Sequence, residues 1–102
     1  MILGLLDEAR EEMRQSALWY DAQRAGLGDE FLDAVGRAFE AIEEHPERYK
    51  KLETRQPDRE VRRNLVKRFP FLIVYEVRSD EILIVAVAHS KRKPNYWQDR
   101  LE

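Results

Sequence analysis

The chain has 102 residues, of which 43% are hydrophobic, and its 18 basic and 20 acidic side chains leave a net charge of −2. This length supports one two-layer core, so we expect a single domain over residues 1–102. The absence of cysteine excludes disulfides, thiolate zinc sites and a thiol nucleophile. The apolar start MILGLL has no basic region and stops at Asp7, too short for a signal peptide or a membrane span. We therefore expect a cytoplasmic protein.

The two halves of the chain differ in charge. Residues 1–60 hold 9 basic and 15 acidic side chains, a net charge of −6, whereas residues 61–102 hold 9 and 5, a net charge of +4. A basic C-terminal half suits an anionic partner, such as a phosphate backbone or an acidic protein surface. A solvated sheet edge protected by Arg and Lys has the same composition, so both interpretations stay open.

The first predicted helix covers residues 7–24. Apolar or small residues recur there every three to four positions, which places them on one helical face. They are Leu6, Ala9, Met13, Ala17 and Tyr20. Asp7 is suited to the N-cap, because its carboxylate can accept a backbone hydrogen bond and favours the positive end of the helix dipole. The GLG segment at residues 26–28 ends the helix, since glycine adopts a left-handed turn at low cost.

A second helix is predicted over residues 29–44, ending before His45 and Pro46. Its apolar residues also share one face. They are Phe31, Leu32, Val35, Ala38, Phe39 and Ile42. Two amphipathic helices joined by a short turn lie antiparallel and share one apolar surface, which needs a flat element to cover.

The C-terminal half supplies that flat element. Residues 61–66, 71–77 and 82–88 are rich in β-branched and aromatic side chains. Short loops separate them, so we expect an antiparallel meander of three strands. Residues 2–5 are a candidate for a further short strand, and the polar residues 49–60 are expected to form an irregular, solvated and mobile connection. The resulting fold is α+β, in the order β-α-α-β-β-β, with an antiparallel sheet and a helical hairpin packed on one face.

The segment AHSKRKPNYWQDR, residues 88–100, gathers candidate chemistry where the last strand ends. His89, Arg92 and Tyr96 can together supply a general acid or base and a clamp for a phosphate. The structural alternative is that Tyr96 and Trp97 form an apolar cover for the end of the sheet, with His89 held by hydrogen bonds. Both interpretations stay open.

The first strand of the meander offers two further cations. Strand alternation places Arg63 and Lys67 on one face, where both can reach one anion. Cations that protect an edge strand from aggregation would follow the same pattern. The acidic helix faces are interpreted as solvated surface. His45 and His89 are too few for a metal site, and the chain has no glycine-rich phosphate loop, so we expect neither a metal nor a cofactor.

Three segments together resemble a known family. ALWYDAQRAGLGDEFLDAV (residues 17–35), RFPFLIVYEV (residues 68–77) and AVAHSKRKPNYWQDR (residues 86–100) are similar, in this order, to the RelE/ParE superfamily of type II toxin-antitoxin toxins. The resemblance implies a small bacterial toxin that a cognate antitoxin wraps and inactivates. It implies a RelE-like fold, with the element order given above and a short C-terminal helical tail.

Members of this superfamily are either ribosome-dependent mRNA endonucleases or poisons of DNA gyrase, and the fold does not choose between them. By resemblance to the nuclease branch, Arg63, Lys67, Arg92 and Tyr96 would bind the scissile phosphate and move protons during attack by the ribose 2′-hydroxyl. This chain departs from that branch, because Arg63 and Leu65 replace its lysine pair and no carboxylate is placed as a base. His89 is the remaining candidate base.

The resemblance implies a toxin and leaves its target open, and metal-independent mRNA cleavage on the ribosome is the function that we expect first. Gyrase poisoning, or a degenerate toxin that only binds its antitoxin, are the alternatives. Leu18, Trp19 and Leu32 fall outside the narrow stripes that two helices need to cover a sheet, Leu32 at the border of its apolar face. We expect the antitoxin to bind over the helical hairpin and the sheet, where these side chains leave some apolar surface exposed.

Overall fold

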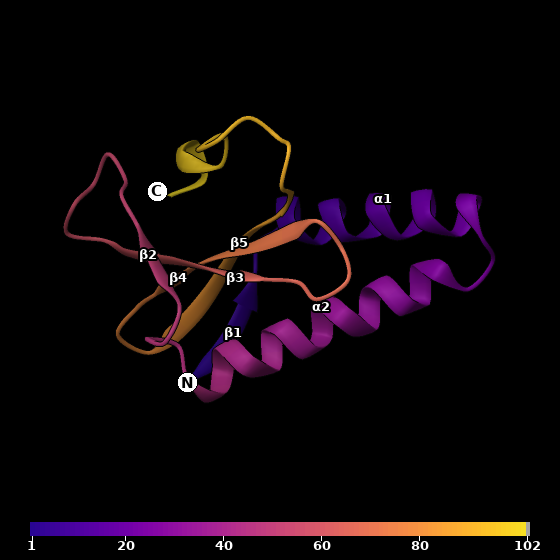
Figure 1. Ribbon diagram of the computed structural model, residues 1–102. Helices are drawn as coiled ribbons and strands as arrows, with labels where there is room; N and C mark the ends of the chain where they lie inside the picture. Colours follow the sequence, from indigo (N-terminus) through magenta and orange to yellow (C-terminus); the bar gives the residue numbers. More distant parts are fainter. Residues whose placement is uncertain (102) are drawn as a thin grey trace.

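The computed structural model describes residues 1–101 (Figure 1). The chain follows the order β1 (Ile2–Leu5), α1 (Asp7–Gln23), α2 (Leu27–Glu44), β2 (Lys50–Leu52), β3 (Glu60–Leu65), β4 (Phe71–Val77), β5 (Glu81–His89) and a 3₁₀ turn, η1 (Gln98–Arg100). The α+β class, the helical hairpin, the three-strand meander and the short helical tail are confirmed. No helix within these residues is long and apolar enough to cross a membrane.

The five strands form one sheet in the order β1-β5-β4-β3-β2. The strands from β2 to β5 pair antiparallel, but β1 pairs parallel with β5, with Ile2 opposite Glu81 and Leu5 opposite Ile84. The expectation of an antiparallel sheet is therefore wrong for β1. A parallel pair needs a long connection between its strands, and here both helices and three strands lie between the two partners.

The connection over residues 49–60 contains β2, which the sequence analysis did not predict. β2 pairs with β3, with Lys51 opposite Arg62 and Leu52 opposite Val61. A polar segment can form this strand because backbone hydrogen bonds to β3 hold it in place. It needs no alternating apolar pattern. The expected solvation of this connection is also wrong for Arg59, whose guanidinium pairs with the buried Glu76.

The helix boundaries differ slightly from the predicted ones. α1 begins at Asp7, so Leu6 occupies the N-cap position and no side chain caps the helix there. α2 begins at Leu27, directly after Gly26, which has a φ of +89°. Gly28 lies against α1, where a Cβ would come within 2.5 Å of the Ala17 carbonyl oxygen, and its N–H donates to Asp21 Oδ1 at 2.7 Å. Gly26 thus permits the turn between the helices, and Gly28 permits their close contact.

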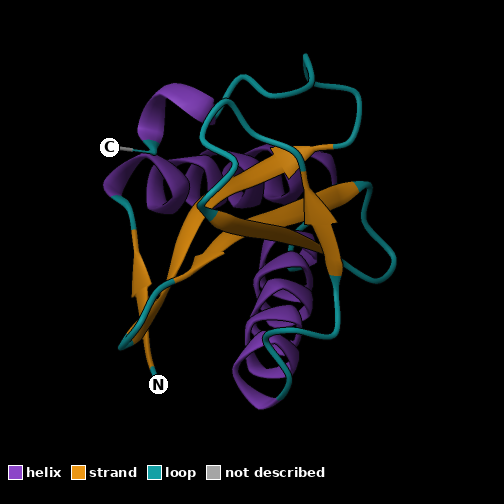
Figure 2. Cartoon of the chain, turned by 90° about the vertical axis from the view of Figure 1, so that its left-hand side faces the viewer, coloured by secondary structure: helices purple, strands orange, loops and turns teal. Residues whose placement is uncertain are grey.

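Apolar residues pack on both faces of the sheet. On the helix side, Phe31, Val35 and Ile42 of α2 belong to one buried cluster with strand residues that include Ile73 and Ile84. In Figure 2 the strands cross in front of the helices. The opposite face, called the open face below, carries a second buried cluster. It consists of Val61, Val74, Val85, Ala86, Trp97 and Leu101. The tail thus covers part of the open face, and the burial of Trp97 agrees with the structural alternative for this residue.

Candidate functional site

The candidate site centres on the carboxylate of Glu12, on α1. Only 13% of this side chain is exposed. Its two oxygens accept hydrogen bonds from the Tyr96 hydroxyl at 2.5 Å, from Arg100 Nη1 and Nη2 at 3.0 Å each, from Arg92 Nη1 at 3.4 Å and from the Val87 N–H at 3.0 Å. One carboxylate therefore joins the first helix to the last strand and to the C-terminal tail.

This arrangement completes the edge of β5. β1 ends at Leu5, opposite Ile84, so the backbone of β5 beyond that point has no neighbouring strand on this side. Glu12 accepts the Val87 N–H, and Arg100 Nη1 donates to the Val85 carbonyl at 3.0 Å. Two side chains thus take the place of a strand, and they satisfy backbone groups that would be costly to bury unpaired.

The ring of Tyr96 lies close to two guanidinium groups. The Cζ atoms of Arg92 and Arg100 lie 3.8 Å and 5.1 Å from the centre of its ring. Burial of Tyr96, together with its hydrogen bond to the Glu12 carboxylate, raises the pKa of the phenol well above its usual value. The hydroxyl consequently stays protonated near neutral pH and acts as a donor to Glu12.

His89 faces α1. It pairs with Phe71 on β4, the two rings are 5.2 Å apart, and its Nδ1 accepts the N–H of Lys91 at 3.1 Å. His89 and Arg92 also line a cavity of about 620 Å³ between α1 and the end of the sheet. The other lining residues are Glu11, Glu12, Gln15, Ser16, Trp19, Tyr20, Pro70, Phe71 and Val87. The lining thus combines aromatic side chains with the charged side chains of Glu11, Glu12 and Arg92.

Arg63 and Lys67 do not join this group. Arg63 lies between Lys50 of β2 and Val74 of β4, and Val74 belongs to the open face. β3 ends at Leu65, so strand alternation does not reach Lys67, and the two cations do not share a strand face. The predicted sharing of one strand face by Arg63 and Lys67 is therefore wrong, and Arg63 does not lie on the same face of the sheet as His89. The reason is register: His89 has the same parity as Val87, which faces the helices.

Sequence reasoning missed Glu12 and Arg100 as members of the site. A glutamate on the polar side of an amphipathic helix has the pattern of solvated surface. The sequence feature that could have identified Glu12 is its position at the border of the apolar stripe, three residues after the buried Ala9 and beside Met13. Within residues 1–101, no three His, Asp or Glu side chains lie close enough together to hold a metal ion.

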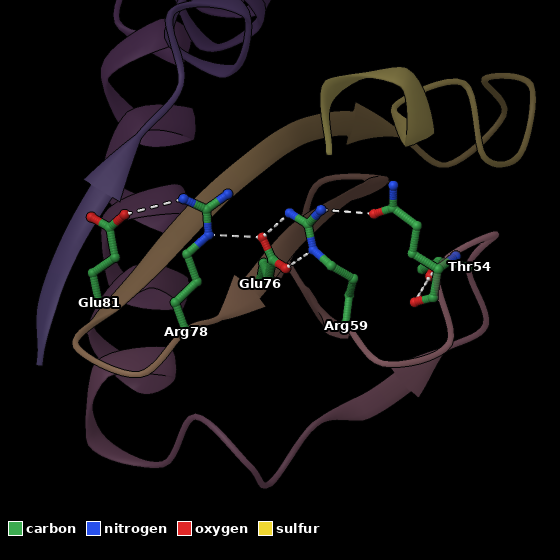
Figure 3. A network of polar contacts seen from close by, with 6 residues as sticks. Thr54, Arg59, Glu76, Arg78 and Glu81 are labelled. Atoms are coloured by element: carbon green, nitrogen blue, oxygen red, sulfur yellow. Dashed lines mark hydrogen bonds and ion pairs between the residues drawn. The ribbon is translucent and has the colours of Figure 1, made fainter. Parts of the chain in front are cut away.

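A second polar network lies on the open face (Figure 3). Glu76 is only 3% exposed and accepts hydrogen bonds from Arg59 Nη2 at 2.8 Å and from Arg78 Nε at 2.9 Å. Arg59 Nη1 continues to Gln56, and Arg78 Nη1 to Glu81. The hydrogen bond from Arg59, followed by that from Arg78, lowers the pKa of Glu76 despite its burial. This network fixes the connection between β2 and β3 to the sheet.

Comparisons with known proteins agree with this fold. A solved structure described as the chromosomal ParDE TA system from P. aeruginosa matches with a TM-score of 0.75, over 89% of this chain and 97% of that chain. The sequences are 15% identical, so this likeness concerns the fold. No curated protein matches the sequence significantly. The family model described as the ParE toxin of the type II toxin-antitoxin system, parDE, matches residues 5–94. The chain belongs to this ParE toxin family.

Proposed function

We propose that this toxin stops growth by binding and poisoning DNA gyrase, and that a cognate antitoxin wraps and neutralises it. The observation that carries the proposal is the engagement of Tyr96 and Arg92 by Glu12. These are the two tail residues that a ribonuclease of this superfamily would use on the phosphate. Here both are bonded to a carboxylate of the same chain, although Arg92 is half exposed.

Cleavage of RNA by its own 2′-hydroxyl needs a base, an acid and a cation around one phosphate. The raised pKa of Tyr96 makes its phenol a poor proton donor near neutral pH, and Glu12 offsets the charge of the neighbouring arginines. Arg63 lies on the open face, away from the cavity that His89 and Arg92 line. These features favour a toxin that acts through binding. The mRNA-cleavage alternative requires Tyr96 and Arg92 to leave Glu12.

The helical hairpin supports the antitoxin part of the proposal. Leu18, Trp19 and Leu32 are exposed, and Trp19 also lines the 620 Å³ cavity beside α1. Large exposed apolar side chains next to an apolar cavity are typical of a surface that a partner covers. We propose that a segment of the antitoxin lies along this hairpin.

Two assays of the purified toxin test the target. One measures DNA supercoiling by gyrase, and the other maps mRNA on translating ribosomes by primer extension. We expect inhibited supercoiling with accumulated DNA breaks, and intact mRNA. Tyr96→Phe, which removes only the hydroxyl, should inhibit gyrase as the wild type does.

Other results lead to other functions. Cut mRNA with unaffected gyrase, abolished by Tyr96→Phe, would overturn the proposal in favour of the nuclease. A toxin that binds its antitoxin but affects neither target would be a degenerate toxin.

A further inference from the structure

The open face carries an exposed patch that the C-terminal tail does not cover. We call it the open-face patch and define it by Lys50, Arg63, Leu65 and Leu72. Cross-strand pairing joins Lys50 to Arg63 and Leu65 to Leu72. Leu65 is 58% exposed and Lys50 is exposed, while Arg63 and Leu72 are half-buried. An apolar pair therefore lies directly beside a pair of cations.

The two cations of this patch have no carboxylate partner. Within residues 1–101, neither the Lys50 nor the Arg63 side chain forms an ion pair or a hydrogen bond, whereas Arg62, the next residue on β3, pairs with Glu60. Like charges directly opposite each other on neighbouring strands are destabilising. The pair therefore has an unfavourable arrangement in the free toxin that a bound anionic group would relieve.

More cations lie at the adjacent end of the sheet. Lys67 and Lys91 are exposed on two loops that the bond from the Ser90 N–H to the Pro70 carbonyl, at 2.7 Å, holds side by side. Residues 61–75 and 82–98 contain no acidic side chain. Lysine on an edge strand commonly prevents aggregation, which explains Lys50 on β2. It does not explain Arg63, which lies on an inner strand, or the exposed Leu65.

We propose that the open-face patch binds an acidic segment of a partner protein, which places carboxylates beside Lys50 and Arg63 and an apolar side chain on Leu65. A polypeptide fits better than a nucleic acid, because proteins that bind single strands present aromatic side chains for base stacking. The cross-strand neighbours of Arg63 and Leu65 are Lys50, Val74 and Leu72, and none of them is aromatic. The inference rests on the proposed function only for the identity of the protein that supplies the segment.

The direct test uses a fluorescent peptide of alternating Glu and Leu, with a polyuridine oligonucleotide of equal length as the second probe. We expect the peptide to bind, and Lys50→Glu or Arg63→Glu to weaken its binding about tenfold or more. Lys51→Glu is the matched control, because it makes the same charge change on β2 but on the other face of the sheet. It should change the affinity by less than about twofold.

The apolar part is tested by Leu65→Ser against Leu18→Ser, two exposed leucines on different surfaces. Only Leu65→Ser should weaken peptide binding. Melting curves show whether each variant is folded. If Lys50→Glu or Arg63→Glu unfolds, the other variant still tests the role of the cations. A peptide that does not bind, or that binds Arg63→Glu as tightly as the wild type, would overturn the inference. Binding of the oligonucleotide instead, lost in Arg63→Glu, would make the patch a nucleic-acid surface.

The gyrase assay separates this inference from the proposed function. If the wild type inhibits gyrase and Arg63→Glu inhibits it equally, the proposed function stands and gyrase is not the protein that supplies the segment; the peptide assay alone then decides the inference. If the wild type leaves gyrase unaffected but the peptide still binds the patch, the proposed function fails. The inference then stands for a different partner protein.

Discussion

Glu12 on α1 accepts a hydrogen bond of 2.5 Å from the hydroxyl of Tyr96, 84 residues further along the chain. The same carboxylate binds Arg100 and the Val87 N–H, so helix, sheet edge and tail meet at one side chain. Trp97 and Leu101, on either side of the η1 turn, bury part of the open face. Because Glu12 holds the residues that flank them, it also fixes this apolar cover in place.

Replacing Glu12 by Ala should lower the free energy of unfolding by about 3 kcal/mol, because it leaves a half-buried arginine without its carboxylate and a backbone N–H without its acceptor. Glu12→Gln keeps an acceptor oxygen and should lose less. Thermal denaturation measures both variants. Glu11→Ala is the control, since the Glu11 carboxylate is next to Glu12 in the sequence but is exposed and pairs only within α1. If Glu12→Ala and Glu11→Ala melt together with the wild type, the carboxylate contributes nothing to stability.

Trp19→Ala should weaken binding of the proposed antitoxin by about 2 kcal/mol, roughly thirtyfold in Kd, because an exposed Trp that lines a cavity is a typical interface anchor. Trp19 is 59% exposed, so the melting temperature of the free toxin should change little. Calorimetric titration of the toxin with antitoxin measures the effect. Ile2→Ala, also exposed but on β1, is the control. Equal affinities for the two variants would place the antitoxin elsewhere.

The fold was predictable where local pattern determines it. Helices with an apolar stripe and strands rich in β-branched residues were identified because burial of those side chains drives their formation. β2 was missed because Lys50–Leu52 has no such pattern and is held by pairing with β3. The parallel direction of β1 was missed because strand direction within a sheet depends on the path of the whole chain.

The candidate site was less predictable, since it depends on contacts between distant residues. The sequence identified Arg92 and Tyr96 in the tail, but their shared partner Glu12 has the pattern of an ordinary surface glutamate. The side of the sheet that His89 faces is set by the register between β4 and β5. A bulge at Val74 and Tyr75 shifts that register, and no single segment encodes it.

The two helix glycines should respond oppositely to alanine. Gly28→Ala brings a Cβ within 2.5 Å of the Ala17 carbonyl, so the helices must move apart, at a loss of about 2 kcal/mol. Around Gly36 a Cβ meets nothing within 4 Å, so Gly36→Ala should gain about 0.5–1 kcal/mol through the better helix propensity of alanine. Urea denaturation measures both. Similar changes in the two variants would contradict the close helix contact at Gly28.

Acid should destabilise the fold through Glu76. Its pKa is lowered in the folded protein by Arg59 and Arg78, so the carboxylate stabilises the fold at pH values above its ordinary pKa in the unfolded chain. That contribution is lost as the pH falls through the lower pKa of the folded state. Glu76→Gln should lower the unfolding free energy by about 3 kcal/mol at pH 7, because it removes the buried charge that accepts hydrogen bonds from Arg59 and Arg78.

The pH dependence shows whether Glu76→Gln destabilises the fold through loss of the charge or through loss of packing. The free energy of unfolding, measured by urea denaturation from pH 7 to pH 3, should fall less steeply in Glu76→Gln than in the wild type, because the variant has one fewer group to protonate. The two curves should converge at low pH, where the wild-type carboxyl is also neutral. Glu30→Gln is the control: Arg68 and Arg24 lower the pKa of Glu30 as well, but its carboxylate is exposed and solvent screens the pairing. Parallel curves for the wild type and Glu76→Gln would mean that the buried charge does not contribute to the acid sensitivity of the fold.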